Sequence, residues 1–260
     1  MRRSPAPTPA VPSPLEARRS SLGFTLVELV VCLGVIAVLC GILLPSLRTT
    51  RESASKVRCL THARQIAVAI AAYHDIHGQM PPSKAIDPTN PPPRPGELMA
   101  TRMNSSGGGE WQGIGRLHGF LGPACECMYC PSHRGRHAQE VYAERLRNPG
   151  NDTIYSNYHY CGHLQHWRDP SDPLHNTPTR LDAGRDLVLL TDGMRTVEDF
   201  NHVTGLNRVF GDLSAEWYRD SEVPGESIRS MLPSGDLQAT IDGSAVSAVW
   251  SRLTDPSGNR

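Results

Sequence analysis

The long apolar segment near the N-terminus constrains this chain of 260 residues more than any other feature. Between Phe24 and Leu44, the conspicuously polar residues are Thr25 and Glu28. As a helix that rises about 1.5 Å per residue, the segment is roughly 30 Å long, enough to cross the hydrocarbon core of a membrane. A carboxylate at that depth is costly and is normally paired and functional. The sequence therefore predicts a membrane-length helix with a functional carboxylate near its start.

The residues before the apolar segment indicate its orientation. They carry four arginines and one acid: Arg2, Arg3, Arg18, Arg19 and Glu16. Because basic residues flanking a membrane helix stay on the cytoplasmic side, residues 1–22 are expected there. The part of the chain that follows the helix is then exported.

Five interpretations of the segment compete. A cleaved secretory signal needs small residues at the end of the apolar run, which instead ends in Gly-Ile-Leu-Leu-Pro-Ser-Leu. A lipoprotein signal places a small residue before the acceptor cysteine, whereas Cys40 follows Leu39. The pair Arg18-Arg19 fits a twin-arginine signal weakly, and a plain membrane anchor leaves Glu28 unexplained. The fifth interpretation comes from residues 23–30.

The sequence Gly-Phe-Thr-Leu-Val-Glu-Leu-Val at residues 23–30 resembles the processing motif of type IV prepilins. The resemblance implies that a prepilin peptidase cuts after Gly23 and methylates the amine of Phe24, and that Glu28 is the fifth mature residue. It implies a cleaved leader over 1–23 and a transmembrane and assembly helix over 24–47. Pro45 also falls where many pilins carry a proline that bends the helix.

The helix is expected to continue over residues 48–79 as an amphipathic segment. Pro45 removes a backbone donor, which predicts a kink near residues 41–45. Gly78 is a plausible C-terminal stop, after which Pro81 and Pro82 forbid continuation. The apolar face is predicted from steps of three and four residues: Val57, Leu60, the stem of Arg64, Ala67, Ile70 or Ala71, and His74.

The end of this helix is also similar to the corresponding segment of bacterial pilin-like and type II secretion pseudopilin-like proteins. Their pattern of Cys, Gln-Ile, Tyr-His and Gly-x-x-Pro-Pro is matched by Cys59, Gln65, Ile66, Tyr73, His74, Gly78, Pro81 and Pro82. Residues 24–77 are thus expected to form one long, bent helix.

The remainder of the chain predicts a small antiparallel sheet with long loops. Residues 80–110 are rich in Pro and Gly without periodicity, which indicates an exposed or partly disordered loop. Residues 111–260 are expected to form an exported, loop-rich β domain. Within it, strands are predicted in 153–164, in 185–193 and on both sides of a turn near Gly211-Asp212. The fold class is therefore α+β, with the long helix packed on the sheet in a pilin-like arrangement.

The C-terminal region carries a third piece of the resemblance. The same pilin-like group has a strand ending in Asp, an Asn-His loop, and a His followed nine residues later by Asp-Gly. Here Asp192, His202 and Asp212 match, while Leu213 replaces the final Gly. These side chains suit an acid/base set or a metal site, but capping of turns by Asp and fixing of a loop by His202 is the favoured interpretation. No nucleophile elbow, phosphate loop or HExxH motif is present, so no enzymatic activity and no cofactor are expected.

The cysteines of the exported part predict disulfides, because that compartment is oxidising. The candidates are Cys125, Cys127, Cys130 and Cys161, and Cys-Pro-Ser at Cys130 resembles the pilin-like group, which supports pairing of Cys130 with Cys161. The alternative is a thiolate metal site of the same four cysteines, or with His133 in place of Cys161. Cys32 and Cys40 lie in the membrane segment and are expected to act as small apolar residues.

Three functions follow as hypotheses. The resemblance implies a structural subunit of a type IV pilus-like or type II secretion pseudopilus filament in the bacterial inner membrane. Its partners are then the prepilin peptidase, other pilin or pseudopilin subunits and an inner-membrane assembly platform. The second hypothesis is a membrane-anchored binding or receptor module that shares this N-terminus, and the third, an exported hydrolase, has the least support. A formal net charge of zero argues against nucleic-acid binding.

Overall fold

Helix α1 begins at Leu26, ends at His77 and belongs to both compact units of the chain, Met1–Arg48 and Thr49–Arg260. The computed structural model describes residues 25–87, 94–104, 108–122, 125–133, 135, 137–223, 225–234 and 243–254. In the first unit, residues Leu26–Leu44 of α1 are long and apolar enough to cross a membrane. The helix runs without interruption through Pro45, and the kink expected there stays a prediction.

The second unit is an α+β structure, as predicted. Its further α-helices are α2 (His118–Leu121), α3 (Gln139–Arg147), α4 (Ile228–Met231) and α5 (Gly243–Thr254). Its strands are β1 (Ala100–Met103), β2 (Glu110–Trp111), β3 (Ile154–Tyr155), β4 (Tyr158–Tyr160), β5 (Val188–Asp192), β6 (Gly205–Phe210) and β7 (Ala215–Arg219). Short 3-10 helices occupy 84–86, 95–99, 113–117, 126–128, 181–186 and 197–199.

Two antiparallel sheets organise this unit. The larger has the order β4-β5-β6-β7, and the smaller has the order β2-β1-β3. All residues of β5 and β6 are buried. A strand buried on both faces reads as a continuous apolar run, which is why Val188–Leu190 could be recognised in the sequence.

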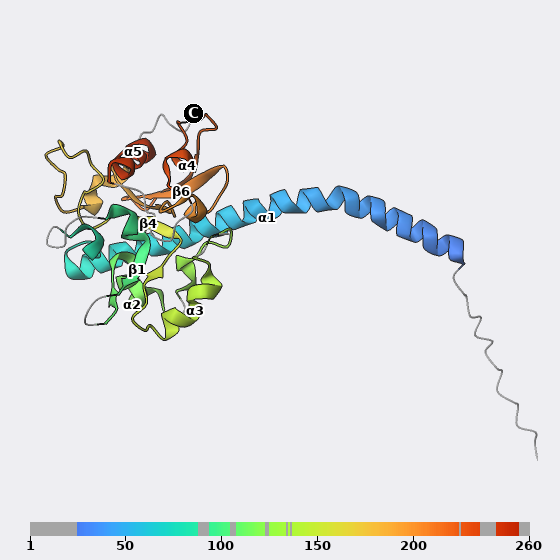
Figure 1. The fold of residues 1–260 in the computed structure, drawn as a ribbon, viewed down its shortest axis with the longest axis horizontal. Helices are drawn as coiled ribbons and strands as arrows, with labels where there is room; N and C mark the ends of the chain where they lie inside the picture. Colours follow the sequence, from blue (N-terminus) through green and yellow to red (C-terminus); the bar gives the residue numbers. More distant parts are fainter. Residues whose placement is uncertain are drawn as a thin grey trace, which may run out of the picture. The chain divides into compact units, whose positions relative to one another are not determined.

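The alternation of side chains along β4 shows what covers the larger sheet. The hydroxyl of Tyr158 donates to the carbonyl oxygen of Cys59 on α1 at 3.1 Å. The next residue, His159, makes an edge-on ring contact with Trp250 on α5 at 5.7 Å. Because successive strand residues point to opposite faces, α1 covers one face of the sheet and α5 lies against the other. Figure 1 shows α4 and α5 next to β6.

The buried face of α1 differs from the predicted one. Val57 is 65% exposed and Arg64 is exposed, although both were assigned to the apolar face. Ala67 and Ile70 are buried as predicted. The side chains that enter the core are those of Cys59, Ala63, Ile66, Ala67, Ala69, Ile70 and Tyr73. The face was misplaced because the alanines that allow close packing carry a weaker hydrophobic signal than Val57 and Leu60.

The end of α1 follows the prediction. Gly78 adopts φ +69° and donates its backbone N–H to the carbonyl oxygen of His74 at 2.8 Å. A left-handed residue after the last turn is the usual helix C-cap, and glycine adopts it without a steric penalty.

The prediction of an exposed loop over residues 80–110 is wrong for the described part of this segment. Met80, Ile86 and Met99 are each at most 1% exposed, and residues 100–103 form the central strand of the smaller sheet. Composition misled the prediction here. Proline is compatible with short 3-10 turns, and these turns place apolar side chains from a Pro-rich segment into the core.

The hairpin between β6 and β7 turns at Gly211-Asp212, as predicted. Leu213, which replaces the glycine of the pilin-like pattern, is the residue of this turn whose backbone conformation is unfavourable for a side chain. Leu213 adopts φ +64°, and its N–H donates to the carbonyl oxygen of Phe210 at 2.9 Å. A type I turn followed by a left-handed residue is a common three-residue hairpin loop, and glycine is favoured at that last position. Leu213 therefore takes a conformation that disfavours branched and bulky side chains.

We expect Leu213→Gly to be more stable than Leu213→Ala by about 1 kcal/mol, since both lose the leucine side chain but only glycine relieves the left-handed strain. Denaturant unfolding of the two variants, followed by tryptophan fluorescence, measures this difference. Equal unfolding free energies for the two variants would show that Leu213 carries no backbone strain.

Candidate functional site

The start of α1 is the first candidate site, and its sequence forms a capping box. Thr25 donates from its backbone N–H and its hydroxyl to Oε2 of Glu28, both at 2.9 Å. The backbone N–H of Glu28 in turn donates to the hydroxyl oxygen of Thr25 at 3.2 Å. This reciprocal pattern satisfies backbone donors that a helix start leaves unpaired.

The capping role of Glu28 was not predicted, although the pattern Thr-x-x-Glu ahead of an apolar run is the sequence signal of a capping box. Gly23 and Phe24, the predicted processing residues, lie outside the described residues.

The apolar side chains that follow Glu28 are exposed in the isolated chain. Leu26, Val27 and Ile42 are 78%, 69% and 68% exposed. The free cysteines Cys32 and Cys40 are exposed on the same segment. A continuous apolar surface of this size needs lipid or other helices to cover it.

The cysteines correct the predicted pairing. Cys130 forms a disulfide with Cys59 on α1, 71 residues away in the chain, and their Cα atoms lie 5.2 Å apart. Cys125, Cys127 and Cys161 are free. Pairing of Cys130 with Cys161 was wrong because the buried face of α1, rather than the next cysteine along the chain, lies against Cys130.

The structure also does not assemble the predicted four-cysteine metal site, because Cys130 is bonded to Cys59. Burial raises the pKa of Cys125 and of Cys127 to about 11, and that of the fully buried Cys161 well above its ordinary value. Because the thiolate is the form that binds metals and acts as a nucleophile, these raised pKa values favour the less reactive thiol form at all three cysteines.

The predicted set of Asp192, His202 and Asp212 is only partly brought together. Asp192 ends β5 and His202 precedes β6, and both side chains are fully buried. Their atoms Oδ2 and Nε2 lie 3.7 Å apart. Asp212 instead lies exposed in the hairpin, where the backbone N–H of Ser214 donates to its Oδ1 at 2.8 Å. Hydrogen bonds from Ser214 lower the pKa of Asp212, as expected for an aspartate that caps a turn.

Glu52 on α1 is the partner of His202 that sequence reasoning did not find. Nδ1 of His202 lies 2.8 Å from Oε1 of Glu52, 150 residues away in the chain. The hydroxyl of Ser132 donates to the other carboxylate oxygen at 3.2 Å. No local sequence signal connects these residues. His202 therefore fixes its loop to α1, in the role favoured by the sequence analysis but with a partner on the helix.

The buried carboxylate of Asp192 has an unusual environment. Its Oδ2 accepts hydrogen bonds from the backbone N–H of Asn207 at 2.6 Å and from the side-chain amide of Asn207 at 3.1 Å. Burial raises the pKa of Asp192, and the nearby His202 and the donors of Asn207 oppose this shift without cancelling it. Asp192 thus joins β5 to β6 rather than capping a turn.

A second polar pair lies close by in the same unit. Nδ1 of His137 lies 2.6 Å from Oδ1 of Asp199, and the hydroxyl of Thr196 donates to Oδ2 at 2.9 Å. Burial raises the pKa of Asp199, but the hydrogen bonds and positive charge around it outweigh burial, so its pKa lies below the usual range. The carboxylate is therefore stabilised in its ionised form.

One comparison with known proteins matches this chain. Residues 18–44 match the family model of the prokaryotic N-terminal methylation motif. No curated protein and no solved structure matches the chain.

The matched motif, the apolar helix and the α+β fold support a prepilin-like protein with a pilin-like fold. More particularly, the motif supports a prepilin substrate of the type IV pilin or pseudopilin kind. It implies processing by a prepilin peptidase and assembly with other pilin subunits. The apolar helix and the motif also fit inner-membrane anchoring with an exported domain.

We expect replacement of both Cys59 and Cys130 by serine to lower the unfolding free energy by up to about 4 kcal/mol, since the disulfide closes a long loop in the unfolded chain. Denaturant unfolding of the full chain in detergent, with tryptophan fluorescence, checks this. Cys127→Ser is the matched control and should change little. An unchanged midpoint for the double variant would contradict the disulfide.

We expect Asp199→Asn to cost about 1–3 kcal/mol at neutral pH, as a buried hydrogen-bonded charge is lost. Because the folded pKa of Asp199 is lowered, its contribution is present above the ordinary carboxyl pKa of about 4 and is lost as pH falls through the folded value. The difference between wild type and variant should therefore shrink in acid. Unfolding free energies over a pH series measure it, with Asp152→Asn, at a side chain 67% exposed, as the control. A difference independent of pH would contradict this assignment.

Proposed function

We propose that this chain is a structural subunit of a type IV pilus-like or type II secretion pseudopilus filament. In this proposal the prepilin peptidase cuts after Gly23, and the mature chain begins with Phe24. The observation that carries the proposal is the methylation motif at residues 18–44 joined to the exposed apolar surface of Leu26–Leu44. Such a surface can rest in the membrane first and then pack against neighbouring helices.

The basic residues of the leader favour a cytoplasmic N-terminus and an exported second unit. An inner-membrane platform would extract the subunit from the bilayer during assembly. The exported unit would then form the outer surface of the filament, around a core made of apolar helices.

Glu28 has two tasks in this proposal. In the isolated chain its carboxylate caps α1 through Thr25. Both contacts use Oε2, so Oε1 is the atom available to the N-terminal amine of Phe24 in a neighbouring subunit. A carboxylate that is buried among apolar helices needs such a positive partner, since an unpaired charge there costs several kcal/mol.

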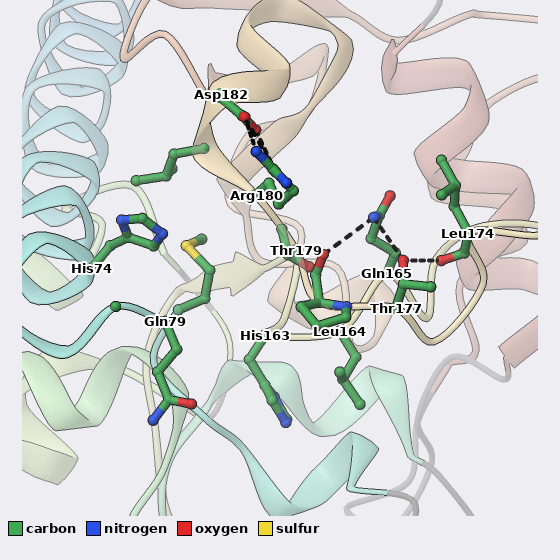
Figure 2. A pocket seen from close by; sticks show the side chains of 14 residues that line it. His74, Gln79, His163, Leu164, Gln165, Leu174, Thr177, Thr179, Arg180 and Asp182 are labelled. Carbon is green, nitrogen blue, oxygen red and sulfur yellow. Dashed lines mark hydrogen bonds and ion pairs between the residues drawn. The ribbon is translucent and has the colours of Figure 1, made fainter.

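A pocket in the second unit supports a second candidate function, a membrane-anchored binding module. It has a volume of about 760 Å³ and lies between the end of α1 and residues 163–182. Figure 2 shows His74 and Gln79 on the side of α1 and His163 and Thr179 on the other. The backbone N–H of Ser83 donates to Nδ1 of His163 at 3.2 Å, and burial lowers the pKa of that imidazole. The lining is mostly apolar, with a few polar groups and the Arg180–Asp182 ion pair among them. Such a lining suits a small ligand with an apolar body and a few polar groups.

Variants of Glu28 separate the filament function from the binding module and also separate charge pairing from capping. We expect Glu28→Ala and Glu28→Gln to be cleaved normally but to assemble more than about tenfold less, since a charged hydrogen bond contributes about 1.5–3 kcal/mol. Glu28→Gln keeps a side-chain acceptor for Thr25, whereas Thr25→Ala removes the cap and keeps the charge. Thr25→Ala should therefore assemble better than Glu28→Gln.

Assembly can be measured in membranes by crosslinking subunits through the exposed native thiols of Cys32 and Cys40. Processing is read from the size of the chain, and substitution of Gly23 should block it. Crosslinked multimers from Glu28→Gln at the wild-type level would reject charge pairing. Absence of multimers from the wild type would reject the filament and favour the binding module.

A further inference from the structure

The strongest unassigned cluster in the second unit surrounds the Cys59–Cys130 disulfide. Within the described residues, the ligand atoms of Cys59, Cys130 and His202 all lie within 4.8 Å of one another, and all three residues are buried. Two sulfur ligands and an imidazole are a donor set that zinc prefers. In this structure the disulfide occupies both sulfurs.

The orientation of His202 is that of a metal ligand. Its Nδ1 lies against the carboxylate of Glu52, while Nε2 lies 3.7 Å from Sγ of Cys130 and 3.7 Å from Oδ2 of Asp192. Metal-bound histidines commonly donate the second ring N–H to a carboxylate in this way. Tetrahedral zinc with bonds of about 2.0–2.3 Å places neighbouring ligand atoms about 3.3–3.8 Å apart. The observed separations from Nε2 already satisfy that spacing.

Asp192 lies beside this cluster, and its Oδ2, 3.7 Å from Nε2, is too far away for a hydrogen bond to the imidazole. Its carboxylate is not one of the groups whose ligand atoms all lie within 4.8 Å of one another. If Nδ1 of a neutral His202 donates to Glu52, the lone pair of Nε2 faces the carboxylate of Asp192. A buried lone pair beside a buried carboxylate is unfavourable unless a proton or a metal cation lies between them.

We propose that reduction of the Cys59–Cys130 disulfide opens a zinc-type site in which Cys59, Cys130 and His202 are the protein ligands, a solvent molecule takes the fourth position, and Glu52 orients His202. The reductant is of the dithiol class: it gives two electrons and two protons to the two sulfurs and leaves as its own disulfide. Binding of the divalent cation then releases the two thiol protons to solvent. Disulfide and metal are therefore mutually exclusive at this pair.

The site has an entry route and a charge balance that suit a divalent cation. The side chain of Glu52 is 43% exposed while His202 behind it is fully buried, so Glu52 connects the cluster to solvent. Two thiolates and a neutral imidazole would leave a bound Zn²⁺ with no net charge. Cys125, Cys127 and Cys161 take no part in this site.

The test uses the full chain in detergent and Co²⁺ as a spectroscopic substitute for Zn²⁺. One sample is reduced with a water-soluble phosphine, which becomes its oxide, and the other is kept oxidised. The reduced chain should bind one equivalent of Co²⁺ with thiolate-to-metal charge-transfer absorption, and Zn²⁺ should displace it. The oxidised chain should show no such absorption.

Variants identify the ligands. Cys59→Ser and His202→Asn should abolish the absorption or weaken binding at least tenfold, and Glu52→Gln should weaken it about 10–100-fold, as expected for the partner of a ligating histidine. Cys161→Ser is the matched control, a buried thiol outside the cluster, and should bind like the wild type. Circular dichroism of each reduced variant reports whether the fold is retained.

Several results would overturn the site. Equal binding by oxidised and reduced chains would exclude the disulfide sulfurs as ligands. Loss of binding in Cys125→Ser or Cys127→Ser, with Cys59→Ser unaffected, would place the metal elsewhere. Unfolding of the reduced wild type that Co²⁺ does not reverse would also reject the proposal, because ligand binding to the folded state must stabilise it.

Discussion

The close packing of α1 against the larger sheet is the interaction on which the second unit depends. From Cys59 to Tyr73, the inner face of the helix is nearly inaccessible to solvent, and it alternates small and large side chains. Ala63 and Ala67 allow the helix backbone to approach the strands, so that the hydroxyl of Tyr158 reaches the carbonyl oxygen of Cys59. The disulfide to Cys130 then ties the same turn of the helix to a loop from the middle of the chain. The core therefore forms between this face of the helix and the larger sheet.

Features set by neighbouring residues could be predicted from the sequence, and features set by distant ones could not. The end of α1 at Gly78, the strand Val188–Asp192 and the hairpin at Gly211-Asp212 each have a local chemical cause. The contacts of Cys59 with Cys130 and of Glu52 with His202 join residues 71 and 150 positions apart. No local pattern specifies them, and a single sequence offers no other source for such pairs.

Composition was a poor guide where packing overrides it. The Pro-rich segment after residue 80 was expected to be exposed, yet Ile86 and Met99 from this segment lie in the interior. The buried face of α1 was also predicted wrongly. Alanine contributes little to a hydrophobic pattern, but it determines how closely a helix can pack. The candidate site was predicted only in part. Asp192 and His202 lie close together, as residues of one predicted set, but their neighbours Glu52 and Cys59 belong to α1 and were not predicted as part of that set.

Two of the carboxylates of α1, those of Glu28 and Glu52, show how one helix serves two different requirements. Glu28 satisfies the start of the helix through Thr25 within a segment whose side chains are otherwise exposed and apolar. Glu52 holds His202 in the interior of the second unit, and that histidine in turn faces the disulfide and Asp192. Each of the two carboxylates is held by a specific partner, Glu28 by Thr25 and Glu52 by His202. The first therefore fixes the start of the helix, and the second joins the helix to the loop that lies against the buried disulfide.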